Sequence, residues 1–232
     1  MNHELRYCAS QSPHRIDIEF IYQGLHEFPG RLNQELRNAL ARVDRNVYDC
    51  VMLNYGLCGN GTLGITHPEL PVVIHNVHDC VPLLIGDGGF HREYLKRCPG
   101  TFWFSCGWIE GFPLPGGEDY SEKYREFYGR EINEQQRDAI ERMLMQNYTH
   151  LTFIRWNELG DRVAEKGRQY TMRCVASLCE RIDYRLQYDE VEGSPSILQR
   201  FVDGDWKKDG SVYLAPGKRL QFDPGSGRLF SE

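Results

Sequence analysis

The feature that most limits the fold of this chain is the repeated succession of a short apolar run, a turn and a helical segment. Apolar runs typical of strands lie at 16–22, 50–55, 70–74, 100–105, 150–156 and 184–188, with a weaker one at 4–8 and an edge strand at 211–214. Helical spacing predicts helices at 31–43, 91–97, 120–148 with a break near Gly129, 161–182 and 196–202. This alternation predicts an α/β fold, a three-layer, largely parallel, Rossmann-like sheet with helices on both faces.

Length and composition are those of an ordinary globular protein. The chain has 232 residues, of which 41% are hydrophobic and 26% charged, so it can bury one sizeable core. We therefore expect residues 1–232 to form a single α/β domain. The stretch 111–119 contains Pro113 and Pro115 and is predicted to be a loop that acts as a lid.

Charge and hydropathy exclude two classes of partner. The formal net charge is −6 and the basic residues are scattered, so we expect no nucleic acid and no anionic membrane surface as a partner. No apolar run approaches the roughly 18 to 20 residues that cross a bilayer, and the N-terminus has no apolar signal core, so we expect a cytoplasmic protein. The eight cysteines are not spaced as in a small secreted scaffold, which predicts reduced thiols.

Soft metal ligands follow two of the predicted strands. Cys58 lies in the glycine-rich turn after the run at 50–55, and His78 and Cys80 follow the run at 70–74. In an open parallel sheet, ligands bind in the crevice beyond the carboxyl ends of the strands. Zinc is bound by Cys sulfur and His nitrogen, and a catalytic zinc site uses three protein ligands. The sequence therefore predicts a zinc site at Cys58, His78 and Cys80, and the ligand types leave iron and cobalt open.

The same residues have simpler interpretations. Free cysteine is among the most buried residue types, so the two cysteines can also be core thiols and His78 a hydrogen-bonded histidine. Asp79 faces away from its neighbours and either orients a histidine or caps the following turn. The turn at 59–61 either offers backbone amides to an anion or cofactor or lets the chain turn sharply, and we favour the second interpretation.

Further candidates end at the same edge of the predicted sheet. Cys8 and Cys106 each follow a predicted strand and are candidate fourth ligands, although both can be small core residues. His26 is either a pocket residue or a histidine at a helix entry, and Trp108 can form the floor of an apolar pocket. The predicted pocket comprises Cys8, His26, Tyr55, Asn60, Asp79, Cys106 and Trp108.

Several longer motifs resemble a known family. They are the stretch 25–32, the turn 55–61 with Tyr48-Asp49, the segment 77–80 with Gly86, the strand 99–105 with Gly107-Trp108, and the stretch 196–206 with Ala215-Pro216-Gly217. Together they are similar to the uncharacterised domain-of-unknown-function family 1638 of methanogenic archaea and anaerobic bacteria. The resemblance covers most of the chain.

The resemblance implies a role near corrinoid-dependent methyl transfer, which organisms with this family often use. A corrinoid is then a candidate cofactor, and a corrinoid protein or a methyltransferase a candidate partner. Zinc methyltransferases of such pathways activate a thiol on a His-x-Cys plus Cys set, which Cys58, His78 and Cys80 resemble in ligand type alone. The chain departs from the family at His75-Asn76, where Pro-Arg is usual, and at Cys106, where proline is usual.

Three hypotheses follow for the function. The first is a metal-binding enzyme or accessory factor of thiol or methyl transfer, in which zinc lowers the pKa of a bound thiol or water. The second is a non-catalytic module that binds a small-molecule ligand or a corrinoid without metal. The third is thiol redox chemistry between Cys58 and Cys80.

Overall fold

The computed structural model has an α/β fold and describes residues 1–232 apart from the side chain of Asp209. The chain divides into two compact units, and each unit joins segments that are distant in the sequence. Unit 1 comprises residues 1–10 and 83–195, and unit 2 comprises residues 11–82 and 196–232.

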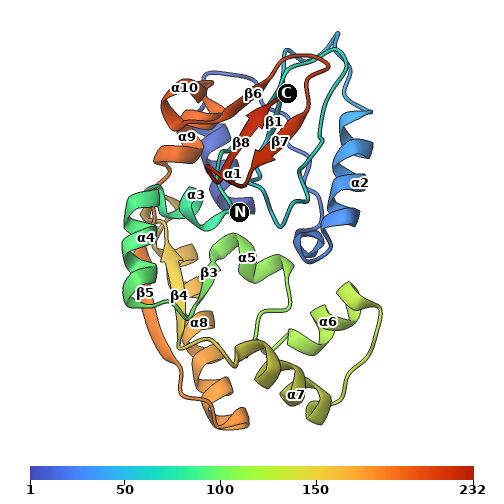
Figure 1. Ribbon diagram of the computed structural model, residues 1–232. Helices are drawn as coiled ribbons and strands as arrows, with labels where there is room; N and C mark the ends of the chain where they lie inside the picture. The colour runs from blue at the N-terminus through green and yellow to red at the C-terminus, as the bar shows by residue number, and fades with distance from the viewer. The chain divides into compact units, whose positions relative to one another are not determined.

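Unit 1 is built on a parallel sheet of three strands (Figure 1). The strand order is β3 (Thr101–Ser105), β4 (His150–Arg155) and β5 (Gln187–Glu192). The predicted strands at 100–105 and 150–156 are confirmed, and β5 begins three residues later than the run at 184–188. The register pairs Phe104 with Phe153, and both side chains are fully buried.

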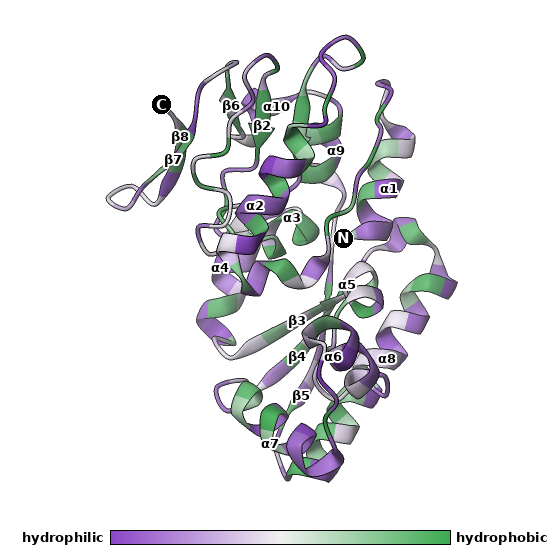
Figure 2. Cartoon of the chain, turned by 90° about the vertical axis from the view of Figure 1, so that its right-hand side faces the viewer, coloured by the Kyte–Doolittle hydropathy of each residue, from purple (hydrophilic) through white to green (hydrophobic). Residues whose placement is uncertain are grey.

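Two helices pack on this sheet, α4 (Gly88–Arg97) and α8 (Asp161–Ile182). The Tyr94 hydroxyl of α4 lies 2.9 Å from the Thr152 hydroxyl, whereas a Cβ added at Gly167 of α8 would lie 2.6 Å from the Phe153 ring. Because consecutive residues of a strand face opposite sides of a sheet, α4 and α8 contact opposite faces. Hydrophobic and hydrophilic residues alternate along α8 (Figure 2), as expected for a helix with one buried face. The predicted helix at 161–182 is confirmed.

A second pair of helices in unit 1 replaces the long predicted helix at 120–148. Gly129 ends α6 (Tyr120–Tyr128) with a φ of 65°, a left-handed conformation that glycine adopts without strain. Asn133 and Gln136 form a capping box that begins α7 (Glu134–Met145). The predicted break near Gly129 is thus confirmed. The remaining elements around unit 1 are α1 (Asn2–Gln11), α3 (Val81–Ile85), α5 (Cys106–Gly111) and η2 (Asn157–Leu159).

The predicted strand at 4–8 is wrong, because these residues lie within α1. The segment contains good helix formers, namely glutamate, leucine and arginine. Its two buried residues, Glu4 and Cys8, are four positions apart and so share one face of the helix. Cys8 therefore follows no strand, and the reason for placing it at the end of one does not hold.

Unit 2 contains a second sheet of three strands, in the order β1 (Val51–Leu53), β2 (Val72–Ile74) and β6 (Val212–Leu214). β1 and β2 are parallel, whereas β6 pairs with β2 in the antiparallel sense. The helix α2 (Pro29–Leu40) buries Leu32, Leu36 and Leu40 in the core of this unit, as the spacing predicts. The other helices are η1 (Gln23–Glu27), α9 (Ser196–Val202) and α10 (Trp206–Asp209), and α9 confirms the helix predicted at 196–202.

One strand prediction in unit 2 needs correction, and one hairpin was not predicted. Residues 16–22 form no strand, although Ile16 and Ile18 are half-buried and the acidic residues between and after them are exposed. The alternation is real, but no strand pairs with this segment. The tail beyond β6, where no strand was predicted, forms an antiparallel hairpin of β7 (Leu220–Asp223) and β8 (Arg228–Ser231).

No helix in the described part of the chain is long and apolar enough to cross a membrane.

Candidate functional site

In unit 2 the predicted ligands lie beyond the carboxyl ends of β1 and β2. The two segments stay hydrogen-bonded there, since Leu57 N donates to Val77 O over 2.8 Å and Cys58 N donates to His78 O over 3.1 Å. Glycine is required at position 56, because a Cβ on Gly56 would lie 2.4 Å from Val77 O. The glycine-rich turn is thereby held directly beside the segment that contains His78.

The turn itself has an unusual backbone. Cys58, Gly59 and Asn60 all have positive φ values, of 47°, 62° and 74°. For a residue with a side chain, this left-handed conformation costs roughly 1 to 2 kcal/mol. The Thr62 hydroxyl donates to Gly56 O over 3.0 Å and closes the turn. The fold therefore holds Cys58 in a strained conformation, a feature that is common at functional sites.

The pKa values of the Cys58 and Cys80 thiols are both raised. Both side chains are half-buried. Burial and, to a smaller extent, the neighbouring Cys58 raise the pKa of Cys80 to about 12. Burial also raises the pKa of Cys58 and that of Tyr55, the latter to about 12 with contributions from both cysteines. The structure thus brings Tyr55 and the two cysteines together as uncharged groups at neutral pH.

His78 and Asp79 point to other partners. The exposed His78 ring lies edge-on to Phe222 of β7, with 5.6 Å between ring centroids. Asp79 Oδ1 accepts a hydrogen bond from Val81 N over 2.8 Å and so caps the start of α3. The described residues contain no group of three or more His, Cys, Asp or Glu side chains that could hold a metal ion. Of the three predicted ligands, the Cys58 thiol acts electrostatically on Cys80, whereas the His78 ring contacts Phe222.

The other predicted pocket residues are divided between the two units. In unit 2, Asn60 and His26 are exposed, and His26 Nδ1 lies 2.7 Å from Gln23 O at the start of the helix η1. In unit 1, Cys8 is fully buried in α1.

Cys106 and Trp108 of unit 1 lie in α5, immediately beyond β3. The Cys106 thiol donates to Val163 O over 3.7 Å, and burial raises its pKa to about 12. The Ser105 hydroxyl accepts from Trp108 N over 3.3 Å and caps the first turn of α5. Within unit 1 these residues form a strand-to-helix junction.

Asn54 and His75 complete the polar edge of the unit 2 sheet, and neither stands among the predicted site residues. His75 Nε2 lies 2.9 Å from Asn54 Oδ1, and the imidazole stacks on Phe201 with 3.8 Å between ring centroids. Burial lowers the pKa of His75 to about 3, so the imidazole is neutral. The sequence could have indicated both residues, because each is the first polar residue after an apolar strand.

These features define an α/β protein with a thiol pair and a buried amide–imidazole pair beyond the ends of two parallel strands. The family model described as "Protein of unknown function (DUF1638)" matches residues 20–202, and the chain belongs to this family. The resemblance carried by the sequence motifs is thereby confirmed. The comparison with curated proteins finds no match, and neither does the comparison with solved structures.

Proposed function

We propose that unit 2 binds a thiophilic metal ion, zinc by preference, through Cys58 and Cys80, and that the protein is an enzyme or accessory factor of thiol or methyl transfer. The observation that carries the proposal is the hydrogen bond from Cys58 N to His78 O, which holds a strained cysteine beside the Cys80 segment. Thiolates are the ligands that zinc prefers. A bound zinc ion would supply a deprotonated thiol or water as nucleophile.

Residues around the two thiols determine how a metal ion or ligand could bind. Metal binding must release protons, because both thiols carry raised pKa values. His78 would be the third ligand of the set, and its exposed imidazole lies edge-on to Phe222. Tyr55, which remains protonated at neutral pH, would offer a hydroxyl donor to a ligand at this edge.

A metal-free module that binds a small molecule or a corrinoid is the second candidate. It is favoured by the contact that the His78 ring makes with Phe222 and by the Asn54–His75 pair, which offers buried polar groups without charge. Under this alternative, the thiols line the ligand site as neutral groups. Metal analysis separates the two candidates.

Two broader assignments accompany the functional proposal. A Rossmann-like, three-layer arrangement of unit 1 is supported by its parallel sheet and by the contacts of α4 and α8 on opposite faces. A cytoplasmic location is supported by the eight cysteines, all of which are free thiols.

The test is metal analysis of untagged protein purified under reducing conditions and supplied with zinc. The wild type should hold about one equivalent of metal, and Cys58→Ser and Cys80→Ser should each lose it. Cys50→Ser is the matched control, because Cys50 is also half-buried but lies just before the amino end of β1. Retention of metal by Cys50→Ser and a weakened affinity in His78→Ala would support a three-ligand site.

Either of two results would overturn the metal proposal. The first is that the wild-type protein takes up no zinc. The second is that Cys58→Ser and Cys80→Ser bind as much metal as the control variant Cys50→Ser. In both cases the metal-free module becomes the better account of the site.

A further inference from the structure

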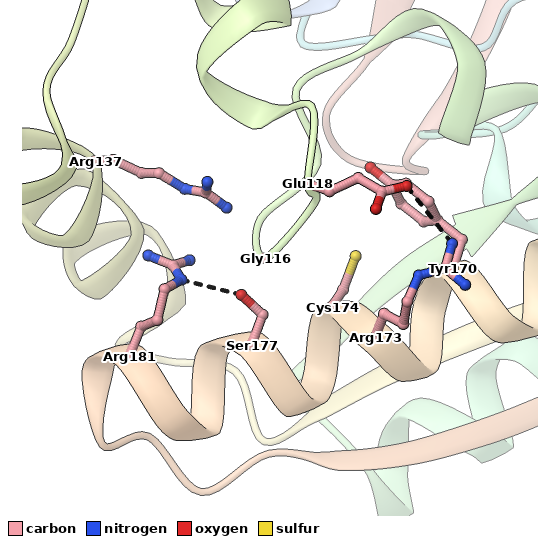
Figure 3. Close-up of a pocket in the computed structure, with 8 residues that line it drawn as sticks. All are labelled: Gly116, Glu118, Arg137, Tyr170, Arg173, Cys174, Ser177 and Arg181. Atoms are coloured by element: carbon pink, nitrogen blue, oxygen red, sulfur yellow. Dashed lines mark hydrogen bonds and ion pairs between the residues drawn. The ribbon is translucent and has the colours of Figure 1, made fainter.

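Unit 1 contains a cavity that is separate from the thiol site of unit 2. It has a volume of about 310 Å³ and lies among α7, α8 and the loop before α6 (Figure 3). Its lining residues are mainly polar or charged and come from elements already described. They are Gly116, Glu118, Arg137, Tyr170, Arg173, Cys174, Ser177 and Arg181.

One wall of the cavity is a loop that the fold holds firmly. Residues 112–117, within the stretch predicted to be a lid, are buried. Gly116 has a φ of 80°, and a Cβ there would lie 2.4 Å from Cys174 O of α8. Gly116 N donates to the buried Glu141 over 2.8 Å, and an Arg137 side-chain nitrogen donates to Gly117 O over 2.7 Å. The cavity therefore has a defined shape.

Two of the cavity arginines are anchored by acids that do not line it. Arg181 pairs with Asp138 and Glu141, and its Nε donates to the Ser177 hydroxyl over 3.0 Å. Arg137 reaches the same Glu141, with 3.4 Å between Nε and Oε1. These contacts fix both guanidinium groups, whose side chains are only 15% and 28% exposed for Arg137 and Arg181. Ordering of these two arginines is thus completed by folding and would add little entropy cost to binding.

The lining itself carries three guanidinium groups and one carboxylate. That carboxylate, Glu118, is 74% exposed and lies 3.7 Å from Arg173, which is longer than a hydrogen bond. Burial raises the pKa of Cys174 to about 12, so this thiol adds no negative charge. Figure 3 shows the Cys174 and Ser177 side chains rising from α8 between Arg137 and Arg181 on one side and Arg173 on the other. The space between them is therefore bordered by guanidinium donors, of which Arg137 and Arg181 have their charge offset by Asp138 and Glu141 and Arg173 has only the exposed Glu118 nearby.

We propose that this cavity binds a small-molecule anion through a phosphate or carboxylate group held between Arg137, Arg181 and Arg173. Guanidinium groups match the geometry of these oxyanions with paired hydrogen bonds. The volume is at the lower end of small-molecule sites, which fits a compact metabolite. Glu118 is the rim carboxylate that a bound anion displaces from Arg173.

The test is isothermal titration of the full chain with inorganic phosphate and, separately, with succinate, at constant ionic strength set with chloride. Arg173→Gln should weaken binding by about tenfold, because it removes one charged donor without touching the anchored pair. Glu118→Gln should strengthen binding, because it removes the competing carboxylate. Arg162→Gln is the matched control, since Arg162 is exposed on the same helix and does not line the cavity.

The pattern of outcomes decides the proposal. Opposite effects of Arg173→Gln and Glu118→Gln, with Arg162→Gln unchanged, support the site, and the tighter of the two probes identifies phosphate or carboxylate as the group recognised. Because Glu118 and Arg173 are exposed, both variants are expected to fold. Absence of saturable binding for both probes, or equal losses in Arg173→Gln and Arg162→Gln, overturns it.

Discussion

The buried imidazole of His75 predicts how the stability of unit 2 depends on pH. The side chain is 2% exposed and contacts Phe201 and Asn54, and burial lowers its pKa to about 3 from the usual 6.5. Between pH 6.5 and about 3, the His75 imidazole is therefore protonated in the unfolded chain but stays neutral in the native protein. Native stability is full above pH 6.5 and falls as the pH is lowered from 6.5 toward 3.

The size of the effect follows from the two pKa values. Well below pH 6.5 the loss is about 1.4 kcal/mol per pH unit, because one proton is taken up on unfolding. At pH 5 the accumulated loss is about 2 kcal/mol, a large part of the stability of an ordinary domain. Other groups also titrate in this range, so a variant without the imidazole is needed to isolate the contribution.

The assay is urea unfolding of the wild type and of His75→Gln at several pH values between 8 and 5, followed by circular dichroism. Glutamine carries an amide that can reach Asn54 but does not titrate. The advantage of the wild type over the variant should shrink by about 2 kcal/mol between pH 8 and pH 5. An advantage that is constant with pH, or an imidazole NMR signal of His75 that titrates near pH 6.5, would refute the reasoning.

Two further predictions concern the glycine-rich turn. Gly56→Ala should destabilise the protein by about 1 to 3 kcal/mol in urea unfolding, because the added Cβ would clash with Val77 O. Gly30→Ala in α2 is the control and should not destabilise the protein, because nothing lies within 4 Å of the added Cβ. Equal unfolding midpoints for the two variants would contradict the close approach of Gly56 to Val77. At the left-handed position 58, the variant Cys58→Gly should be more stable than Cys58→Ala by about 1 kcal/mol. At positions with negative φ, alanine is usually the more stabilising of the two residues. A more stable alanine variant would mean that residue 58 does not adopt a positive φ in solution.

Local patterns predicted the helices well. The helices at 161–182 and 196–202 agree with α8 and α9, and α2 buries the leucines that its spacing selects. Helical hydrogen bonds close within one segment, so the information that forms a helix lies within that segment. Strands were predicted less well, as residues 4–8 and 16–22 show. A strand needs a partner whose position only the complete fold determines.

The candidate site shows the same difference between local and long-range information. Residue order alone predicts that Cys58 and His78 follow two parallel strands, and strand direction then carries both segments to one edge of the sheet. The contact of the His78 ring with Phe222, the left-handed backbone of Cys58 and the burial that keeps His75 neutral arise only on folding. Folding also assembles the arginine cavity from α7, α8 and a loop. These properties depend on neighbours distant in the sequence, and no local pattern records which groups a side chain will meet after folding.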